Sequence, residues 1–214
     1  MKILLFITSH RQVEEYHYFN LFLKRLKLKC DIYIYCNNPD ISSEIVSYFK
    51  EFEQFKHLFI TSLNDGYRMG AIEAISRGIE MGIFNGYDYV IHIHPDVFII
   101  DDTNLLSLLH EHKSNDTVFL VNKCFPNDDT HFAADFFIFK PKLLPKDLFI
   151  KELYTYKDSP ECYLFYLLKK NNIIHVIVPR FKNDSWYPRR IDDYLRLYHE
   201  HDMEKVKELL FILN

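Results

Sequence analysis

The sequence predicts an α/β protein, a three-layer sandwich in which helices cover both faces of a mostly parallel central sheet. Apolar runs of strand length alternate with amphipathic stretches at helical spacing along most of the 214 residues. These apolar runs are nearly continuous, as expected for strands that are buried on both faces. A chain of this length is sufficient for one domain with one hydrophobic core.

The first part of the chain is expected to alternate strands and helices. The helices are assigned from apolar residues on one face, and the strands from apolar runs that end in polar or turn-forming residues. In the third helix, Ala74 and Gly78 are small, which permits close packing on a sheet. The expected order is strand 2–8, helix 13–28, strand 30–36, helix 42–55, strand 57–61 and helix 71–81.

The second part is less regular, and prolines interrupt its pattern. The expected elements are a strand within 88–102, helix 104–112, strands 117–122 and 132–139, helix 162–170, strand 173–178 and two short helices at 191–198 and 203–212. All of them belong to the same single domain.

The composition disfavours several classes of partner. Hydrophobic residues make up 48% and charged residues 26%, which is typical of a globular protein, and the formal net charge is −4 at pH 7. This charge disfavours binding to nucleic acid or to an anionic membrane surface. The 15 Tyr and 19 Phe residues indicate a largely aromatic core.

The cysteines indicate a reducing compartment. Cys30, Cys36, Cys124 and Cys162 form neither a Cys-x-x-Cys pair nor the spacing of a zinc site. We therefore expect reduced thiols and a cytoplasmic location. No apolar run is long enough to cross a bilayer, so we expect no integral membrane segment.

The stretch 88–102, Asp-Tyr-Val-Ile-His-Ile-His-Pro-Asp-Val-Phe-Ile-Ile-Asp-Asp, is expected to hold the chemistry. The side-chain period of two in a strand places His92, His94 and Asp96 on one side. Pro95 favours an extended conformation at His94, so an imidazole and a carboxylate are presented together where the strand ends. These are metal-ligand types, although an ordinary strand followed by a Pro-Asp turn explains them equally well.

Polar residues follow the other early strands as well. His10, Asn37 and Asn64 come after the first, second and third expected strands, and Asp96 comes after the fourth. In a parallel α/β sheet, ligands bind outside the carboxyl ends of the strands near a topological switch point. We therefore expect these side chains to gather at one edge of the sheet.

The chain resembles glycosyltransferases of the GT-A fold, which use nucleotide-activated sugars and have a Rossmann-like sandwich. The order of elements over 1–141 is similar, and His94-Pro95-Asp96 stands where the family has its Asp-x-Asp metal motif. His94 replaces the first Asp of that motif. Imidazole is a good ligand for Mn²⁺ and adds no negative charge, so the resemblance implies a divalent metal, with Mn²⁺ favoured over Mg²⁺. The other residues that carry the resemblance are Asn64-Asp65-Gly66, Arg68, Gly70, Ala74 and Gly78.

The resemblance implies roles for particular residues. Asp96, with His94, is the expected ligand of a metal that stabilises the departing nucleoside diphosphate, and a bond to ribose or phosphate is the alternative role of His94. Arg11 and Arg68 are candidates for binding the diphosphate, or else are solvated surface arginines. Asn64 and Asp65 bind the nucleotide or simply form the turn at Gly66. The expected nucleotide contacts are Thr8, His10, Arg11, Asn37, Asn64, Asp65, Arg68 and His94.

A transferase that inverts the sugar needs a carboxylate to deprotonate the acceptor hydroxyl. Asp135 lies among apolar residues, where burial would raise its pKa, and Glu161 opens an expected helix. The base is left open between these two, and Asp135 is slightly favoured for binding the sugar or the acceptor. Further candidates for a metal ligand are His175, His199 and His201.

The expected function is that of a metal-assisted glycosyltransferase. It would move a hexosyl or deoxyhexosyl group from a nucleotide-diphosphate sugar, with a UDP-sugar favoured, to a glycan or other hydroxyl acceptor. In this interpretation 1–102 is the nucleotide-binding half, 103–190 the acceptor half and 191–214 the C-terminal helices. The alternatives are a non-catalytic nucleotide-sugar or glycan-binding module and a sugar-nucleotide nucleotidyltransferase, which ranks last because no glycine-rich loop follows the first strand.

Overall fold

The computed structural model describes residues 1–9, 13–38, 40, 42–60, 70–123, 131–145, 148, 159–180 and 191–213. The strands in these ranges are β1 (Ile3–Ser9), β2 (Asp31–Cys36), β3 (Phe55–Ile60), β4 (Tyr89–Ile93), β5 (Val97–Ile99), β6 (Phe119–Lys123), β7 (Phe132–Phe139), β8 (His175–Val178) and β9 (Leu197–His199). The helices are α1 (Val13–Leu23), α2 (Ser42–Phe49), α3 (Gly70–Glu80), α4 (Thr103–Glu111), α5 (Pro160–Lys170), α6 (Met203–Leu213) and the 3₁₀ helix η2 (Pro141–Leu143).

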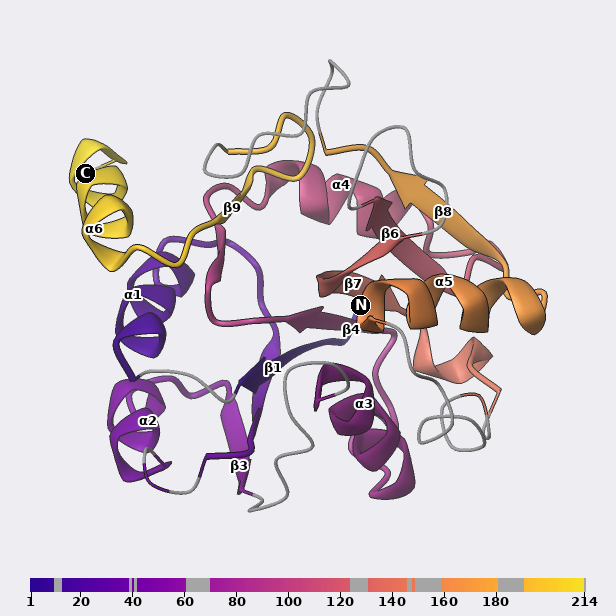
Figure 1. The fold of residues 1–214 in the computed structure, drawn as a ribbon, viewed down its shortest axis with the longest axis horizontal. Coiled ribbons are helices and arrows are strands. Elements are labelled where there is room, and N and C mark those ends of the chain that lie inside the picture. The colour runs from indigo at the N-terminus through magenta and orange to yellow at the C-terminus, as the bar shows by residue number, and fades with distance from the viewer. Residues whose placement is uncertain are drawn as a thin grey trace.

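Seven strands form the central sheet in the order β3-β2-β1-β4-β7-β6-β8, and β5 and β9 form a separate pair (Figure 1). Strands β1, β2, β3 and β4 are parallel, and β8 is parallel to β6. Strand β7 is antiparallel to both of its neighbours, β4 and β6. The sheet is therefore mostly parallel, and the carboxyl ends of β2, β1 and β4 lie side by side at one edge.

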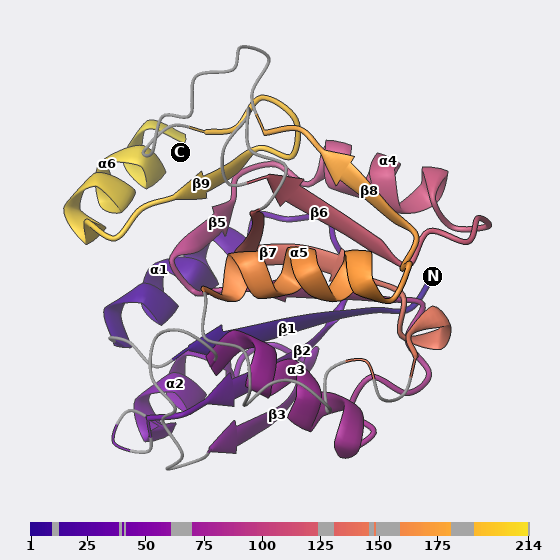
Figure 2. The same ribbon diagram turned by 45° about the vertical axis from the view of Figure 1, so that its right-hand side comes forward.

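Helices cover both faces of the sheet, which completes the expected three layers (Figures 1 and 2). The alternation of side chains in β1 shows the division: Leu5 and Ile7 point into one apolar cluster, and Leu4 and Phe6 point into the other. The first cluster is closed by residues of α1, α2, α4 and α6, and the second by residues of α3 and α5. The sequence-based prediction of the fold class is confirmed.

The core is aromatic, as the composition predicts. Phe6, Phe119 and Phe137 are fully buried, and the ring of Phe137 lies 6.1 Å from that of Phe119. The buried hydroxyl of Tyr89 donates to the carbonyl oxygen of Leu109 at 2.8 Å, which satisfies a polar group inside the apolar layer. Cys30, Cys36 and Cys162 are free thiols. Among the described helices, none combines the length and the apolar character that a bilayer span requires.

Three expected elements differ most from the structure. Helix α1 ends at Leu23 rather than at residue 28. Helix α2 ends at Phe49, and Phe55 already belongs to β3. Phe49 and Phe52 are among the apolar residues whose spacing favours a helix over 42–55. In the structure they pack together with Phe55 across the turn, because the ring of Phe49 lies 5.9 Å from each of the rings of Phe52 and Phe55.

The third difference is the expected helix at 191–198, which is wrong because a turn leads there into β9. The Asp192 carboxylate accepts hydrogen bonds from four successive backbone N–H groups, those of residues 194–197, and so closes the turn. Arg196 has a φ of 58°, in the left-handed region, which ends any right-handed helix at this point. The expected helix at 203–212 is present as α6.

Close packing of α3 gives a first testable prediction. A Cβ atom on Gly78 would overlap the ring of Phe84, which is itself buried against Phe6 and Phe139 and has little room to move. We expect Gly78→Ala to lower the free energy of unfolding by about 1–3 kcal/mol, measured by urea denaturation.

The double variant Gly78→Ala/Phe84→Leu is the matched control, because the smaller leucine leaves space for the new methyl group. Its loss of stability should be smaller than the sum of the two single losses. An unchanged free energy of unfolding in Gly78→Ala would show that α3 shifts away from the sheet without cost.

Candidate functional site

The site is built around the end of β4, at the edge where the neighbouring parallel strands also end. Strand β4 pairs with β1 in parallel and with β7 in antiparallel register, so it lies where the direction of the sheet changes. His94, Pro95 and Asp96 follow its last residue. Asn37, at the end of β2, belongs to the same edge. The parallel register therefore places two of the four expected strand-end residues at one edge of the sheet.

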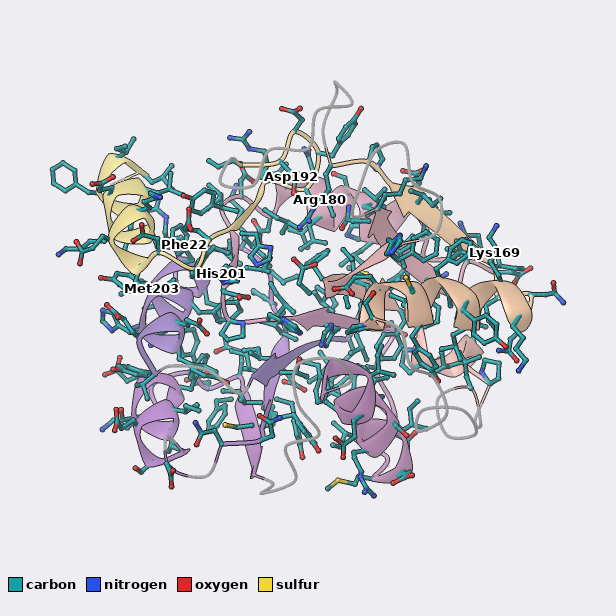
Figure 3. The ribbon with its side chains drawn as sticks, in the orientation of Figure 1. Phe22, Lys169, Arg180, Asp192, His201 and Met203 are labelled. Atoms are coloured by element: carbon teal, nitrogen blue, oxygen red, sulfur yellow. The ribbon has the colours of Figure 1, made fainter. Side chains whose placement is uncertain are left out.

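A second segment reaches this edge from far along the chain. Strand β9 pairs with β5, which places His199 opposite Val97, and the Glu200 N–H donates to the Asp96 carbonyl oxygen at 3.1 Å. The Glu200 carboxylate accepts from the backbone N–H groups of His201 and Asp202, which holds the turn into α6. Figure 3 shows His201 at the start of α6. As a result, Asp96 lies next to His199 and His201, which follow it by about half the length of the chain.

In the described part of the chain, Asp96, His199 and His201 form a group whose side chains can bind a metal ion. We call these three residues the donor group, after their metal-ligating atoms. The Asp96 Oδ2 atom lies 2.9 Å from His201 Nδ1 and 3.7 Å from His199 Nε2, and the three donor atoms all lie within 4.8 Å of one another. Ligands at about 2.1 Å from a shared metal ion lie about 3–3.5 Å apart, so the spacing suits a divalent cation after a small closure.

Two further observations fit a metal ion at this group. His199 Nε2 is buried and makes no hydrogen bond to any described residue, since 3.7 Å to Asp96 is too long for one. An orphaned buried nitrogen that points at a carboxylate is suited to a cation between the two. The His201 side chain is 56% exposed, so one side of the group stays open to an incoming ligand.

Asp135, in β7, joins the group through His199. Its Oδ2 atom accepts from His199 Nδ1 at 2.9 Å and lies 3.7 Å from Arg180 Nη2. Figure 3 shows Arg180 near Asp192, on the side of the molecule where β9 lies. The predicted site residue Asp135 and the predicted metal ligand Asp96 thus flank one imidazole.

The charges of this group shift one another. Burial alone would lower the pKa of His199, but the hydrogen bond from Nδ1 and the two carboxylates raise it to about 10. Burial alone would raise the pKa of Asp135, but Arg180 and His199 outweigh it and hold that pKa well below its usual range. The pKa of Asp96 is likewise held far below its usual range by His199 and His201, against the effect of burial. Without a metal ion, a protonated His199 balances these carboxylates.

His94 lies beside this group but is not one of its members. Its backbone N–H donates to the Asp135 carbonyl oxygen at 3.0 Å, and its ring stands edge-on to that of His92, with centroids 5.4 Å apart. His92 is fully buried, and its Nε2 atom lies 2.8 Å from the Thr8 hydroxyl. Burial lowers the pKa of His92 well below its ordinary value, so this ring is neutral, as expected of a core histidine.

Of the other expected site residues, Asn37 and Glu161 belong to the described part of the chain. Asn37 is 8% exposed, and its buried Oδ1 atom accepts no hydrogen bond from a described residue. Glu161 lies in the first turn of α5, which Ser159 caps, and α5 begins on the side of the sheet where β1 ends (Figure 2). The remaining expected contacts lie outside the described residues: His10, Arg11, Asn64, Asp65 and Arg68.

The histidines at the end of the chain carried only a weak signal. His199 and His201 are two residues apart after a short apolar run, as on one side of a strand, yet that run suggested a helix. His175, named with them as a third candidate, lies elsewhere, with Nδ1 2.8 Å from the Ile173 carbonyl oxygen. The pairing of β9 with β5 is what distinguishes His199 and His201 from His175.

Comparison with known proteins relates this arrangement to solved structures. No protein-family model matches the sequence, and no curated protein sequence matches it either. Mouse xyloside xylosyltransferase 1 is similar in structure, with a TM-score of 0.58 and 9% identity over 95% of this chain and 99% of that chain. A mannosyltransferase from Pyrobaculum calidifontis, solved with GDP-Man and Mn²⁺, has a TM-score of 0.60 and 9% identity over 83% of this chain and 54% of that one.

A cytidylyltransferase from Leptospira borgpetersenii is also similar, with a TM-score of 0.51 and 15% identity over 90% of this chain and 80% of that chain. At such identities a likeness establishes the fold, whereas the chemistry has to be argued from the side chains. The order of strands and the helical layers agree with these structures, so the chain has a fold of the GT-A type.

Proposed function

We propose that this protein is a metal-assisted glycosyltransferase that takes its sugar, a hexosyl or deoxyhexosyl group, from a nucleotide-diphosphate sugar. The observation that carries the proposal is the donor group of Asp96, His199 and His201 at the end of β4. In a fold of this kind, ligands bind at the carboxyl ends of the strands where the strand order switches, and this group lies there. The proposed acceptor is a glycan or another hydroxyl compound.

The proposed metal ligands differ in part from those expected from the sequence. Asp96 keeps its role, and His199 and His201 take the place expected of His94, which is left to bond the ribose or a phosphate. A divalent cation held there would stabilise the negative charge of the departing nucleoside diphosphate. One carboxylate with two imidazoles suits Mn²⁺ better than Mg²⁺, which prefers oxygen ligands.

Asn37 is the described residue that best fits a nucleotide contact. Its side-chain amide offers a donor and an acceptor, and a buried Oδ1 atom with no described partner is suited to an N–H group of a base. A UDP-sugar is the favoured donor, and a GDP-sugar is the second choice because the Pyrobaculum mannosyltransferase was solved with GDP-Man. Thr8, His10, Arg11, Asn64, Asp65 and Arg68 complete the proposed donor site.

Glu161 is the better of the two candidates for a catalytic base. Asp135 is held ionised by Arg180 and already accepts the N–H of His199, so it is poorly placed to take a proton from an acceptor. Glu161 stands in the first turn of α5, and α5 begins on the side of the sheet where β1 ends (Figure 2). We assign the base role to Glu161.

Calorimetric titration with UDP, GDP and several UDP- and GDP-sugars, each with and without Mn²⁺, tests the proposal. We expect one nucleotide to bind in a metal-dependent manner and its sugar to be transferred or slowly hydrolysed. Metal-dependent binding without turnover would support a non-catalytic nucleotide-sugar module instead. No binding to any of these nucleotides would leave a glycan-binding module as the better interpretation.

A nucleotidyltransferase is the second candidate, because the Leptospira cytidylyltransferase shares the fold. The sequence Thr8-Ser9-His10-Arg11, which spans the end of β1, contains no glycine and so lacks the glycine-rich loop expected of that class, which ranks it lower. Incubation with nucleoside triphosphates and sugar 1-phosphates distinguishes the two, since only a nucleotidyltransferase releases pyrophosphate.

The role of Asp96 gives a second prediction. We expect Asp96→Asn to weaken Mn²⁺-dependent nucleotide binding by at least about tenfold, because it removes the one carboxylate of the donor group. Calorimetric titration measures the change, and Asp116→Asn, which removes an exposed carboxylate, serves as the matched control. Equal affinities in wild type and Asp96→Asn would show that the metal site has been assigned to the wrong residues.

A third prediction concerns the stability of the metal-free protein. The pKa of His199 is about 10 in the folded state and about 6.5 in the unfolded state, so its protonation stabilises the fold. This contribution is complete below pH 6.5 and disappears as the pH rises to about 10. Since the side chain is one-third exposed, we expect the loss to be about 1–2 kcal/mol.

Urea denaturation in the presence of a chelator, at intervals from pH 6 to pH 10, measures this loss. His199→Gln is the control, because it keeps a polar side chain that does not titrate. The difference in free energy of unfolding between wild type and His199→Gln should shrink as the pH rises. A difference that stays constant over this range would contradict the charge balance described above.

A further inference from the structure

Asp135 is unusual in its strand. The sequence of β7, Phe-Ala-Ala-Asp-Phe-Phe-Ile-Phe, contains one charged residue, and seven of its eight side chains are buried. The Asp135 side chain itself is 16% exposed, and the alternation of β7 places it on the same face as Phe137 and Phe139. Burying a carboxylate in such surroundings costs free energy unless hydrogen bonds or opposite charges replace its lost hydration.

The two partners of Asp135 differ in what they do. Arg180 Nη2, at 3.7 Å, supplies a positive charge without a close hydrogen bond. His199 Nδ1, at 2.9 Å, makes a hydrogen bond in which the ring nitrogen donates and the carboxylate accepts. That bond fixes the orientation of the imidazole ring about its own axis, and it assigns the proton to Nδ1.

The other nitrogen of the same ring faces the donor group. His199 Nε2 lies 3.7 Å from Asp96 Oδ2 and is buried. When His199 is neutral and its proton is held on Nδ1 by Asp135, the lone pair of Nε2 points to the place where a cation is shared with Asp96. Carboxylates that accept the second N–H of a ligating histidine fix its tautomer and raise its basicity.

We propose that Asp135 is a positioning residue of the metal site, which acts by holding His199 in the tautomer and orientation that present Nε2 next to Asp96. This role rests on the metal-assisted function proposed above and replaces the expected role of Asp135 in binding the sugar or acceptor. Arg180 is part of the same device, because its charge keeps Asp135 ionised and available as an acceptor.

The substitution Asp135→Asn separates this role from a purely structural one. Asparagine has nearly the same size, but its neutral amide accepts a weaker hydrogen bond and, when flipped, donates to Nδ1 and so favours the wrong tautomer. Loss of an outer carboxylate of this kind typically weakens metal binding 10- to 100-fold. We expect a loss in that range for Mn²⁺.

The measurement is a titration of Mn²⁺ alone, followed by the electron paramagnetic resonance signal of the free ion. It needs no nucleotide and no turnover. Four proteins are compared: wild type, Asp135→Asn, His199→Ala and the double variant. Asp116→Asn, which removes an exposed carboxylate, is the matched control and should bind Mn²⁺ as the wild type does.

The double-mutant cycle decides whether Asp135 acts through His199. We expect Asp135→Asn to weaken Mn²⁺ binding in the wild type and to change it by less than about twofold in the His199→Ala background. An equal loss in both backgrounds, or no loss in the wild type, overturns the proposal. If the wild type itself binds no Mn²⁺, the metal-assisted function fails first, and the role of Asp135 fails with it.

A second measurement uses the unmodified protein, in case Asp135→Asn does not fold. Long-range ¹H–¹⁵N correlation spectra of the protein with Zn²⁺, a diamagnetic probe, report which ring nitrogen of His199 carries the proton. We expect a protonated Nδ1 and an unprotonated Nε2. The opposite assignment would overturn the proposal without any substitution.

Discussion

The short antiparallel ladder between β5 and β9 is the contact on which the candidate site depends. It consists of three residue pairs, and it is continued by the hydrogen bond from the Glu200 N–H to the Asp96 carbonyl oxygen. Such a ladder would be marginal alone. It is anchored by Phe98, whose ring packs on Phe19 and Phe22 of α1, and by α6, which also packs on α1. Hydrophobic packing of α1 therefore determines the geometry of a polar site at some distance.

The second constraint on the site is electrostatic. Two mostly buried carboxylates, Asp96 and Asp135, lie on either side of His199, and Arg180 lies beyond Asp135. Buried charges of this density are tolerated only when opposite charges compensate them. In the metal-free protein a proton on His199 serves that purpose, and a divalent cation would take it over at Nε2. The residues that stabilise the metal-free fold are thus the ones to which we assign the metal ion.

Local periodicity was sufficient for most of the fold and for half of the site. The strands from β1 to β4, the helices α3 to α6 and the placement of Asp96 at a strand end all follow from patterns within about ten residues. Strands β5 and β9 have three residues each, too few to show a period, and their pairing depends on contacts across the chain. From the sequence, His199 and His201 are therefore candidates for a further metal ligand on a par with His175, and the structure brings these two to Asp96.

The end of α2 and the segment before β9 were mispredicted for related reasons. Phe52 and Phe55 repeat at a helical interval, yet they satisfy tertiary contacts with Phe49 from a turn and a strand. Asp192 binds four backbone N–H groups of the following residues, and this capping outweighs the helical pattern of the apolar side chains. Both cases show side chains overriding a local preference of the backbone.

The residues of the candidate site are synthesised at widely separated times. Asp96 emerges with the first half of the sheet, whereas His199 and His201 emerge long after it, with strand β9, which pairs with β5. A nascent chain that has completed β4 carries Asp96 without His199 and His201, so the proposed metal site would be incomplete at that stage. The metal affinity that we propose would therefore arise late in synthesis, once β9 has docked on β5.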